Sequence, residues 1–513
     1  MLDRRIHLRN PTAEFYSPAV LKGYRLDFNL YVPSWRGAAA TIVTDPGSSV
    51  WGAVWIIERK QMYRLDEQEG VHLRWYIPIN VTVTTPQGRD LIARTYRESI
   101  LLPKLSEGET LPPARRPSNT YLQVMILGAY EAGLPPQYIG YLHTFPTNGR
   151  IADSHIRNKL GYPFNVSDLI SLFNSSAGTN SKDVLYETEK WVSDESLFPH
   201  TNGAPGQILQ AIQNSQIALV DNAPKGTQLK LLLLLEGKQK LYFKPKRYEL
   251  DNVIKGKIYA GYDRHNSEVF AYYLAMVLNF KWIAPSVIRK IHIDKDIVPK
   301  ATLALNKTMV KNESGSTCIY GKCFYCKRNE TVCPDQNGEI EGAAILYLDR
   351  QFKIHKSPWR RSYTTRKMEW EEDNNFCKKV IGTLSLKRIL NLIDVAVFDF
   401  LIQNGDRHRY EVYKDQIVLL DNGKGLGNPT VDELDILAPL YQCCMLSSKT
   451  WQNLELLSGG SLSETIELLA GYQGNKLATE EHFKAVDRRL MKIYATVQYC
   501  IGKYGSTKVL KKN

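Results

Sequence analysis

All eight cysteines of this 513-residue chain lie between Cys318 and Cys500, and the first 317 residues contain none. They are Cys318, Cys323, Cys326, Cys333, Cys377, Cys443, Cys444 and Cys500. An even number of cysteines gathered in one region indicates disulfides and therefore an oxidising compartment. The alternative is a zinc site, which usually pairs two C-x2-C knuckles. Because only Cys323 and Cys326 have that spacing, we expect disulfides in the C-terminal part of the chain.

The length corresponds to two to four domains, at roughly 100–200 residues per domain. Hydrophobic residues make up 43% of the chain and charged residues 23%, which excludes a disordered tail, a collagen or a coiled coil. No apolar run approaches the roughly 20 residues that span a bilayer, so we expect no transmembrane segment. The start, MLDRRIHLRN, lacks the apolar stretch of a signal peptide. Taken alone, a genuine start of this kind predicts a cytoplasmic protein.

The net charge of +13 is spread along the chain rather than gathered in one stripe. Because neither a basic patch nor an aromatic RNA-binding motif is present, we expect no nucleic-acid partner. A diffuse positive charge suits a polyanionic ligand such as a nucleotide or an acidic glycan.

Residues 1–147 have the pattern of a small α+β domain with a sheet or barrel. Short β-rich runs, ATIVT, VWGAVWII, RWYIPINVTVTT and DLIARTY, are separated by turn signals at Asp45–Gly47 and Pro86–Gly88. One helix is expected near Tyr121–Ala132. Residues 148–182 are polar and predict a linker, interrupted by an apolar patch at Asp168–Phe173 that would form a short helix.

Residues 183–513 form the second expected domain. Strands are predicted at LKLLLLLEG and KLYFKPK, a helix at Ser267–Leu278, and mostly helices beyond Leu386. A β-rich part followed by a helical part is the order of the two lobes in kinase-like folds. The fold class is therefore α+β with two domains.

Four residues of the second domain stand in the chain order that phosphoryl transfer needs. This reaction uses a lysine on the phosphates, a glutamate that holds the lysine, an aspartate near the acceptor hydroxyl and a metal-binding aspartate. Lys244 ends an apolar strand, and Glu268 begins a helix. Asp406 lies in GDRHRYE, and Asp421 follows the apolar run IVLL. Each residue alone is as well explained by a surface charge or a turn, so only the combination indicates a kinase.

The motifs differ from those of an ordinary protein kinase. The step from Asp406 to Glu411 matches the spacing from the catalytic aspartate to the metal-binding asparagine of protein kinases, with Glu in place of Asn. LDNG stands where those kinases have DFG. The chain has no GxGxxG loop and no complete HRD motif, which argues against that class.

The second domain resembles the secretory-pathway kinase family that contains the Golgi casein kinase and the glycosaminoglycan xylosylkinases. The matching stretches are KGTQLKLLLLLEGKQKLYFKPKRY, YAGYDRHNSEVFAYYL, CIYGKCFYC, DRHRYE, LLDNGKGLGNP and LAPLYQCC, spread over nearly all of residues 183–505. The C-x4-C-x2-C spacing from Cys318 is similar to the xylosylkinase form. The resemblance implies an atypical two-lobed kinase-like fold, ATP and Mn2+ as cofactors, and a place in the Golgi lumen.

The resemblance also implies a role for each aligned residue. Asp406 would be the catalytic aspartate. Glu268 and Asp421 would bind Mn2+, and Glu268 would also orient Lys244. Because the family's pseudokinase replaces this glutamate, Glu268 implies an active enzyme. Nucleotide contacts are implied for Gln228, Lys244, Ile345, Leu346, Tyr347, Leu348, Glu411 and Asp421, with residues 345–348 as the hinge against the adenine.

A cysteine pairing follows from the same resemblance. The implied disulfides are Cys318–Cys333, Cys323–Cys326, Cys377–Cys443 and Cys444–Cys500, which lowers the weight of the zinc alternative. Asn306, Asn312 and Asn329 are sequons that flank the cysteine loop, and they are candidate glycosylation sites in a secreted protein.

The first domain resembles gamma-glutamylcyclotransferase through RIHLRNPTAEF, WRGAAATIV, VWGAVW, LDEQEGV and LGAYEAGLP. By itself, LDEQEG reads as an acidic turn between strands. The resemblance implies that Glu69 moves the proton as 5-oxoproline forms, and that Tyr96 and Tyr121 line the site. The YGSN loop that grips the γ-glutamyl group in this family is not found ahead of Ile6. We therefore expect a barrel that lacks one strand, with two unpaired strand edges and little cyclotransferase activity.

The main functional expectation is transfer of the γ-phosphate of ATP to the 2-hydroxyl of xylose in the linkage region that joins glycosaminoglycans to proteoglycans. The alternatives are a protein serine kinase of the same family and a gamma-glutamylcyclotransferase. A further alternative makes the first domain a binding module or a remnant. Because the two halves imply different compartments, a genuine fusion and a merged or truncated gene model both stay open. The sequence also leaves the oligomeric state open.

Overall fold

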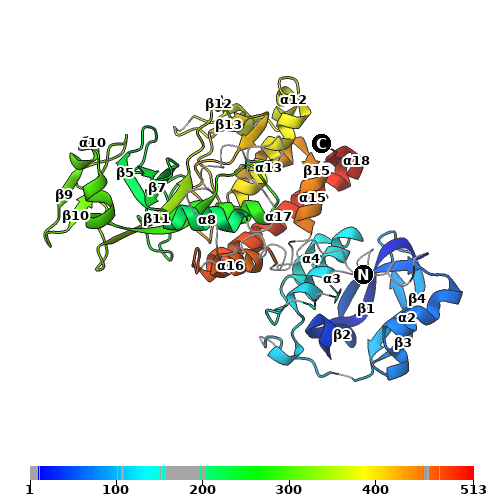
Figure 1. Ribbon diagram of the computed structural model, residues 1–513. Helices are drawn as coiled ribbons and strands as arrows, with labels where there is room; N and C mark the ends of the chain where they lie inside the picture. Colours follow the sequence, from blue (N-terminus) through cyan, green and yellow to red (C-terminus); the bar gives the residue numbers. More distant parts are fainter. Residues whose placement is uncertain are drawn as a thin grey trace. The chain divides into compact units, whose positions relative to one another are not determined.

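The computed structural model describes residues 10, 12–100, 102–105, 109–150, 152–153, 155–156, 196–197, 204–364, 366–455, 457, 461–472 and 474–512. The chain divides into two compact units (Figure 1). Unit 1 is Met1–Asn165 with Glu455–Ser461, and unit 2 is Val166–Leu454 with Leu462–Asn513. The helix expected at Asp168–Phe173 lies outside the described residues, and the bounds 147 and 183 stay predictions.

Unit 1 is built on a four-stranded sheet with the order β2-β1-β3-β4. Its strands are β1 (Glu14–Val32), β2 (Gly37–Ile56), β3 (Tyr76–Thr84) and β4 (Asp90–Glu98). Its helices are α2 (Met62–Gln68), α3 (Asn119–Glu131) and α4 (Pro136–Leu142), with short 3₁₀ turns at Pro33–Trp35, Arg59–Gln61, Val71–Leu73 and Pro113–Arg115. The alternation of VTVT in β3 places Val81 and Val83 in the core beside Ala19 and Leu21. The expected helix near Tyr121–Ala132 is confirmed as α3.

One expectation for this sheet is wrong. Asp45–Gly47 is no turn between strands, because β2 continues through it. Between the pairs Lys22↔Ser49 and Tyr24↔Thr44, β2 has more residues than β1, and these residues form a bulge opposite Gly23. Gly23 has a φ of +81°, a conformation that glycine adopts without strain. The two unpaired strand edges are present as expected, because β2 and β4 are the edges of an open sheet among the described strands.

The first lobe of unit 2 is a five-stranded antiparallel sheet with the order β5-β6-β7-β11-β8. Its strands are β5 (Ile217–Asn222), β6 (Leu231–Leu235), β7 (Lys240–Pro245), β8 (Ser286–His292) and β11 (Glu339–Leu346). The predicted strands LKLLLLLEG and KLYFKPK are confirmed as β6 and β7. Helices α8 (Ala204–Asn214) and α9 (His265–Val277) both contact β8 and β11. Every residue of α9 is buried, which makes it the internal helix of this lobe.

The second lobe of unit 2 is mostly helical, as expected. Its long helices α13 (Leu386–Ile402) and α17 (Glu480–Tyr504) pack on each other. A small sheet with the order β12-β13-β14 lies beside α13 and carries the loops that hold Asp406 and Asp421. The lobe's other elements are β12 (Lys353–Lys356), α11 (Glu369–Glu372), α12 (Phe376–Ile381), β13 (Arg409–Tyr413), β14 (Gln416–Val418), α14 (Ala438–Cys443), β15 (Leu446–Ser447), α15 (Ser448–Glu455), α16 (Ser461–Tyr472), α18 (Ser506–Val509), β16 (Leu510–Lys511) and a 3₁₀ turn at Leu434–Leu437.

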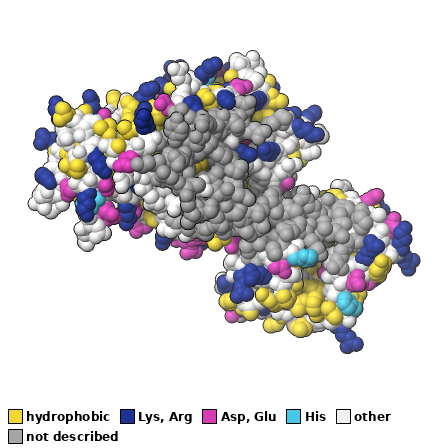
Figure 2. Space-filling view, in the orientation of Figure 1, with side chains coloured by type: hydrophobic (Ala, Val, Ile, Leu, Met, Phe, Trp, Pro, Cys, Tyr) yellow, Lys and Arg dark blue, Asp and Glu magenta, His cyan; other side chains and the backbone are white. Residues whose placement is uncertain are grey.

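Between β8 and β11 of the first lobe the chain forms short elements: a π-helical turn at Ile293–Ile297, a 3₁₀ turn at Val298–Lys300, α10 (Leu303–Asn306), β9 (Met309–Lys311) and β10 (Thr317–Ile319). No helix in the described part of the chain is both long enough and apolar enough to cross a membrane. On the face drawn in Figure 2, Lys and Arg side chains are scattered over both units among acidic ones. This pattern agrees with the diffuse charge of the sequence.

All eight cysteines are paired. The disulfides are Cys318–Cys333, Cys323–Cys326, Cys377–Cys443 and Cys444–Cys500, which is the pairing that the family resemblance implies. No free cysteine remains, so the zinc alternative is wrong. Cys377–Cys443 ties α12 to α14, and Cys444–Cys500 ties the end of α14 to α17. The two bridges therefore hold the helices of the second lobe together.

Loss of the Cys377–Cys443 bridge should destabilise the full chain strongly. The bridge spans 66 residues, and closing a loop of that length in the unfolded chain corresponds to about 4 kcal/mol. Urea unfolding of the double Cys→Ser variant should show this loss. The matched control is the double variant of Cys323–Cys326, which spans 3 residues and should lose only about 1.5 kcal/mol. Equal losses would contradict the expectation.

Candidate active site

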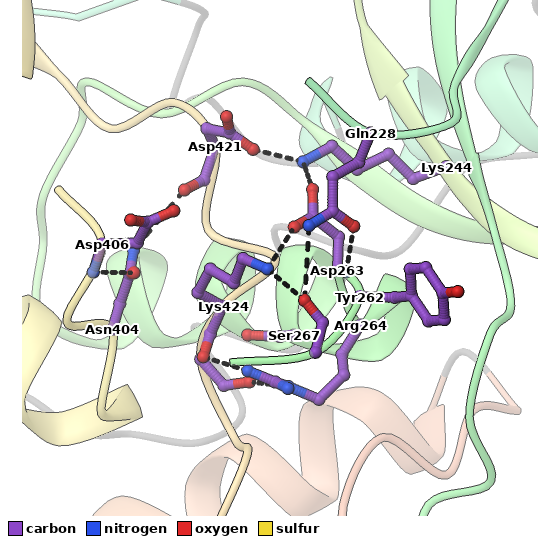
Figure 3. A network of polar contacts seen from close by, with 12 residues as sticks. Gln228, Lys244, Tyr262, Asp263, Arg264, Ser267, Asn404, Asp406, Asp421 and Lys424 are labelled. Atoms are coloured by element: carbon purple, nitrogen blue, oxygen red, sulfur yellow. Dashed lines mark hydrogen bonds and ion pairs between the residues drawn. The ribbon is translucent and has the colours of Figure 1, made fainter. Parts of the chain in front are cut away.

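Lys244 is the centre of the polar network in unit 2 (Figure 3). Its ammonium donates to Glu268 Oε1 at 2.7 Å, to Asp263 Oδ2 at 2.9 Å and to Asp421 Oδ1. The residue is only 5% exposed. Burial by itself would lower the pKa of Lys244, but the charges of the three carboxylates outweigh burial and raise it. Lys244 therefore stays positively charged and is surrounded by three carboxylates.

The local folds explain why these groups meet. Lys244 lies on β7, inside the sheet, where it pairs with Ala343 of β11. Glu268 is in the first turn of α9, and Asp263 directly precedes that helix. Asp421 has a φ of +57° just beyond β14, and Lys244 lowers its pKa. The Lys–Glu pair that the motifs predict is thus present in the structure.

Asp406 lies on the loop between α13 and β13. Its backbone N–H donates to Asn404 Oδ1 at 3.3 Å, and its carboxylate accepts a hydrogen bond from the hydroxyl of Tyr363. The same hydroxyl lies 3.0 Å from His408 Nδ1. Burial raises the pKa of Asp406, and the hydrogen bond from Tyr363 opposes that rise.

A cavity of about 630 Å³ joins these groups. Its polar wall includes Gln228, Lys244, Asp263, Asp406 and Lys424. Its lining also includes the rings of Tyr259, Tyr262, Tyr320, Tyr325, Tyr363 and His408. A pocket with both cations and a carboxylate can hold a phosphate donor beside a hydroxyl acceptor, and aromatic faces suit the apolar faces of a sugar ring.

The other residues predicted to contact the nucleotide lie in different parts of unit 2. Gln228 accepts from Asp263 N–H at 2.8 Å and donates to Gly261 O at 3.3 Å. The segment 345–348 ends β11 and leads out of the sheet, with Tyr347 N–H donating to Lys240 O at 3.0 Å. Glu411 lies on β13 opposite Ile354, and burial raises its pKa. Residues 345–348 and Glu411 are not part of the cavity lining.

Glu268 and Asp421 offer the chemistry that a divalent cation needs. Their carboxylate oxygens converge on the position that the Lys244 ammonium holds, and hard oxygen ligands suit Mn2+. Among the described side chains, no group of three or more His, Cys, Asp or Glu is arranged to hold a metal. Two carboxylates completed by substrate phosphates are the usual arrangement for such ions in phosphoryl transfer. The residues therefore fit the cation that the resemblance implies.

In unit 1, the predicted cyclotransferase residues make separate contacts. Glu69 is not in a simple turn but caps the end of α2, because Gly70 takes a left-handed φ of +65° that ends the helix. Its Oε1 accepts from Gln68 Nε2 at 3.2 Å. The hydroxyl of Tyr96 donates to Asp66 at 2.6 Å, and the hydroxyl of Tyr121 accepts from Ala40 N–H at 3.1 Å.

The motif reasoning missed four residues of unit 2 that shape the cavity or its loops: Asp263, Tyr363, Arg407 and Lys424. Asp263 and Lys424 stand in the matching stretches YDRHNSE and DNGKG, and Arg407 follows Asp406 directly. Their places in these motifs could have identified the three residues. No motif marks Tyr363, because 43 residues separate it from Asp406.

The fold and the site together define a kinase-like protein of two lobes. Residues 183–509 match the family model described as Golgi casein kinase, C-terminal, Fam20. The chain belongs to this family. Residues 49–142 match the model of the AIG2-like family, so unit 1 carries an AIG2-like domain.

Curated relatives support the same placement of unit 2. The glycosaminoglycan xylosylkinase homolog of Drosophila melanogaster is 42% identical, over 64% of this chain and 79% of that protein. The glycosaminoglycan xylosylkinase of Homo sapiens is 41% identical, over 63% and 81%.

Solved structures share the fold of unit 2. A hydra Fam20 determined with sugar is 35% identical, with a TM-score of 0.60 over 66% of this chain and 99% of that one. The Golgi casein kinase with Mn/ADP bound is 25% identical, with a TM-score of 0.61 over 71% and 95%. A solved gamma-glutamyl cyclotransferase is 33% identical over 31% of this chain and 92% of that one, with a TM-score of 0.27.

Replacing Tyr363 with phenylalanine should move the acidic limb of the pH–rate profile to higher pH. The lost hydroxyl stabilises the charged form of Asp406 and so lowers its pKa; its removal lets burial raise that pKa further. The measurement is kcat/KM of the full chain for phosphoryl transfer, followed against pH. Tyr259→Phe is the matched control, because its ring packs on Tyr363 at 4.8 Å between centroids. An unmoved limb in Tyr363→Phe would contradict the expectation.

Proposed function

We propose that this protein transfers the γ-phosphoryl group of ATP to the 2-hydroxyl of xylose in the linkage region of proteoglycans. The observation that carries the proposal is the convergence of Lys244, Glu268 and Asp421 beside a cavity that Asp406 also lines. The xylosylkinase names of the relatives support the choice of acceptor. The aromatic rings in the cavity lining are in keeping with a sugar.

The proposed reaction is one in-line displacement. A bond forms between the xylose 2-oxygen and the γ-phosphorus, the bond from that phosphorus to the β-phosphate oxygen breaks, and ADP leaves with the electron pair. Asp406 accepts a hydrogen bond from the acceptor hydroxyl, orients it and takes its proton. Lys244 neutralises charge on the donor phosphates, and Glu268 fixes the lysine in that position.

Mn2+ would be held by Glu268 and Asp421, and it supplies charge neutralisation on the phosphate oxygens. We further propose that Gln228 and Glu411 contact the nucleotide and that residues 345–348 form the hinge against the adenine. The position of 345–348, at the exit of the five-stranded sheet, supports this assignment.

We also propose that the protein works in the Golgi lumen. Four disulfides in unit 2 need an oxidising compartment to persist. Asn306, Asn312 and Asn329 would then be open to glycosylation.

The test is a transfer assay with the full chain, Mn2+ and γ-labelled ATP. We expect strong labelling of a galactosyl-xyloside and weak labelling of casein. A 2-deoxy-xyloside is the matched control acceptor and should stay unlabelled. Efficient labelling of casein without labelling of the sugar would replace the proposal with the protein serine kinase alternative.

A second candidate function belongs to unit 1. The AIG2-like match spans Glu69, Tyr96 and Tyr121, and Glu69 at the end of α2 could serve as the proton carrier of a gamma-glutamylcyclotransferase. The assay is release of 5-oxoproline from γ-glutamyl-alanine by the full chain. Rapid release that Glu69→Gln abolishes would assign this activity.

A further inference from the structure

Lys424 is a second lysine in the active-site cavity. It lies in the DNGKG stretch, three residues after Asp421, and is only 8% exposed. Its ammonium lies 3.6 Å from Asp263 Oδ1 and donates to the carbonyl of Gly261. The other oxygen of Asp263 binds Lys244. One carboxylate therefore holds two lysines, and both lysines line the cavity (Figure 3).

The loop around Lys424 is built to bring it there. A Cβ on Gly423 would lie 2.7 Å from the Cβ of Asp263, and a Cβ on Gly425 would lie 2.4 Å from Ser267 Oγ. The two glycines thus allow the loop to press against the start of α9. Arg264 N–H donates to Gly423 O at 2.7 Å, and Ser267 Oγ donates to Asn422 O at 2.7 Å. The Arg264 guanidinium donates to the carbonyls of Lys424 and Gly425, so the loop backbone is held at four consecutive residues.

The charge of Lys424 acts on both sides of the reaction centre. Burial lowers the pKa of its ammonium, while Asp263 and Asp406 oppose that effect. In turn, Lys424 lowers the pKa of Asp406. The ammonium thus lies in the same cavity as the Asp263 carboxylate that anchors Lys244 and the Asp406 carboxylate proposed to face the acceptor.

We propose that Lys424 stabilises the phosphoryl group during its transfer from ATP to the acceptor, with Asp263 as the residue that positions it. This inference rests on the proposed kinase function. The chain has no GxGxxG loop whose backbone N–H groups could cover the phosphates. As the γ-phosphorus leaves the β-phosphate oxygen and bonds to the acceptor oxygen, negative charge spreads over the oxygens of the transferred phosphoryl group. A fixed cation at that place stabilises the transition state more than the bound ATP.

The test compares Lys424→Met and Lys424→Arg in the full chain with Mn2+ and ATP. We expect Lys424→Met to lower kcat by about 10²–10³-fold, as removal of one preorganised charge contact does. KM for ATP and for the galactosyl-xyloside should stay within about threefold, because the contact matters mainly in the transition state. Lys424→Arg should recover at least about a tenth of kcat, because it restores the charge.

Lys378→Met is the matched control, because Lys378 is an exposed lysine of α12 outside the cavity. Its kcat should equal that of the wild type. The melting temperature of Lys424→Met reports the competing structural role. A kcat within threefold of the wild type, or a loss that only follows a fall in melting temperature, would overturn the inference. So would failure of Lys424→Arg to recover activity at normal stability.

The outcome is separable from that of the proposed acceptor. If the wild type labels casein rather than the sugar, the acceptor is wrong. The same variants are then compared on casein, because departure of the γ-phosphoryl group is common to both reactions. If the wild type labels neither, the comparison uses release of phosphate from ATP by the same chain.

Discussion

Replacing Asp406 with asparagine should lower phosphoryl transfer by about 10³-fold, within the range for losing a positioned proton acceptor. Asparagine keeps the shape of the side chain but cannot take a proton or carry the charge that orients the acceptor hydroxyl. KM for ATP should change little, because the proposed role of Asp406 is toward the acceptor hydroxyl and Lys244 has its own carboxylate partners. Initial rates with a galactosyl-xyloside, at saturating ATP and Mn2+, measure the effect.

Asp415→Asn is the control for this substitution. Asp415 lies on the turn between β13 and β14, and its side chain is 71% exposed. It is therefore close in the chain but outside the cavity. We expect wild-type rates from this variant. A rate for Asp406→Asn within tenfold of the control would remove Asp406 from the catalytic role.

Replacing Arg407 with methionine should cost about 3–5 kcal/mol of unfolding free energy, because it leaves the buried Asp399 carboxylate without its partner. The pair is bidentate, at 2.7 and 2.9 Å, and both side chains are under 10% exposed. Arg407 also donates to Leu420 O and to Asn422 Oδ1. It thus ties the loop of Asp406 to the loop of Asp421. Urea unfolding of the full chain measures the loss.

The double variant Arg407→Met/Asp399→Leu separates stability from activity. Replacing a whole buried ion pair by apolar groups is often close to neutral, so most of the stability should return. The two loops would still lack their tie, so kcat should stay low. Wild-type turnover by the double variant would show that Arg407 stabilises the lobe without positioning the loops.

Much of unit 2 could be predicted from local pattern. The apolar run of β6 and the helix that became α9 were found within two residues of their ends, because hydrophobic period reports which face of an element is buried. Lys244, Glu268, Asp406 and Asp421 were also found in this way, since each lies in such an element or within a few residues of its end. Their meeting was only an expectation from the order of motifs.

Unit 1 shows where local pattern misleads. Asp45–Pro46–Gly47 has the composition of a turn, yet these residues continue β2, because the pairing with β1 on both sides holds them in the sheet. Local pattern also left open whether these strands form a sheet or a barrel. Closure depends on hydrogen bonds between strands that are far apart in the chain, and no local pattern reports whether β2 and β4 meet.

Order along the chain was enough to identify two α+β domains, a kinase-type set of acids with one lysine, and cysteines destined for disulfides. Each of these depends on residue type and short spacing. The sharing of Asp263 by Lys244 and Lys424, the hydrogen bond from Tyr363 to Asp406 and the tie of Arg407 to Asp399 are different in kind. Lys424 follows Asp263 by 161 positions, and their approach depends on two glycines that pack against α9. Such contacts arise only in the folded tertiary structure, because the packing of loops against helices decides which side chains meet.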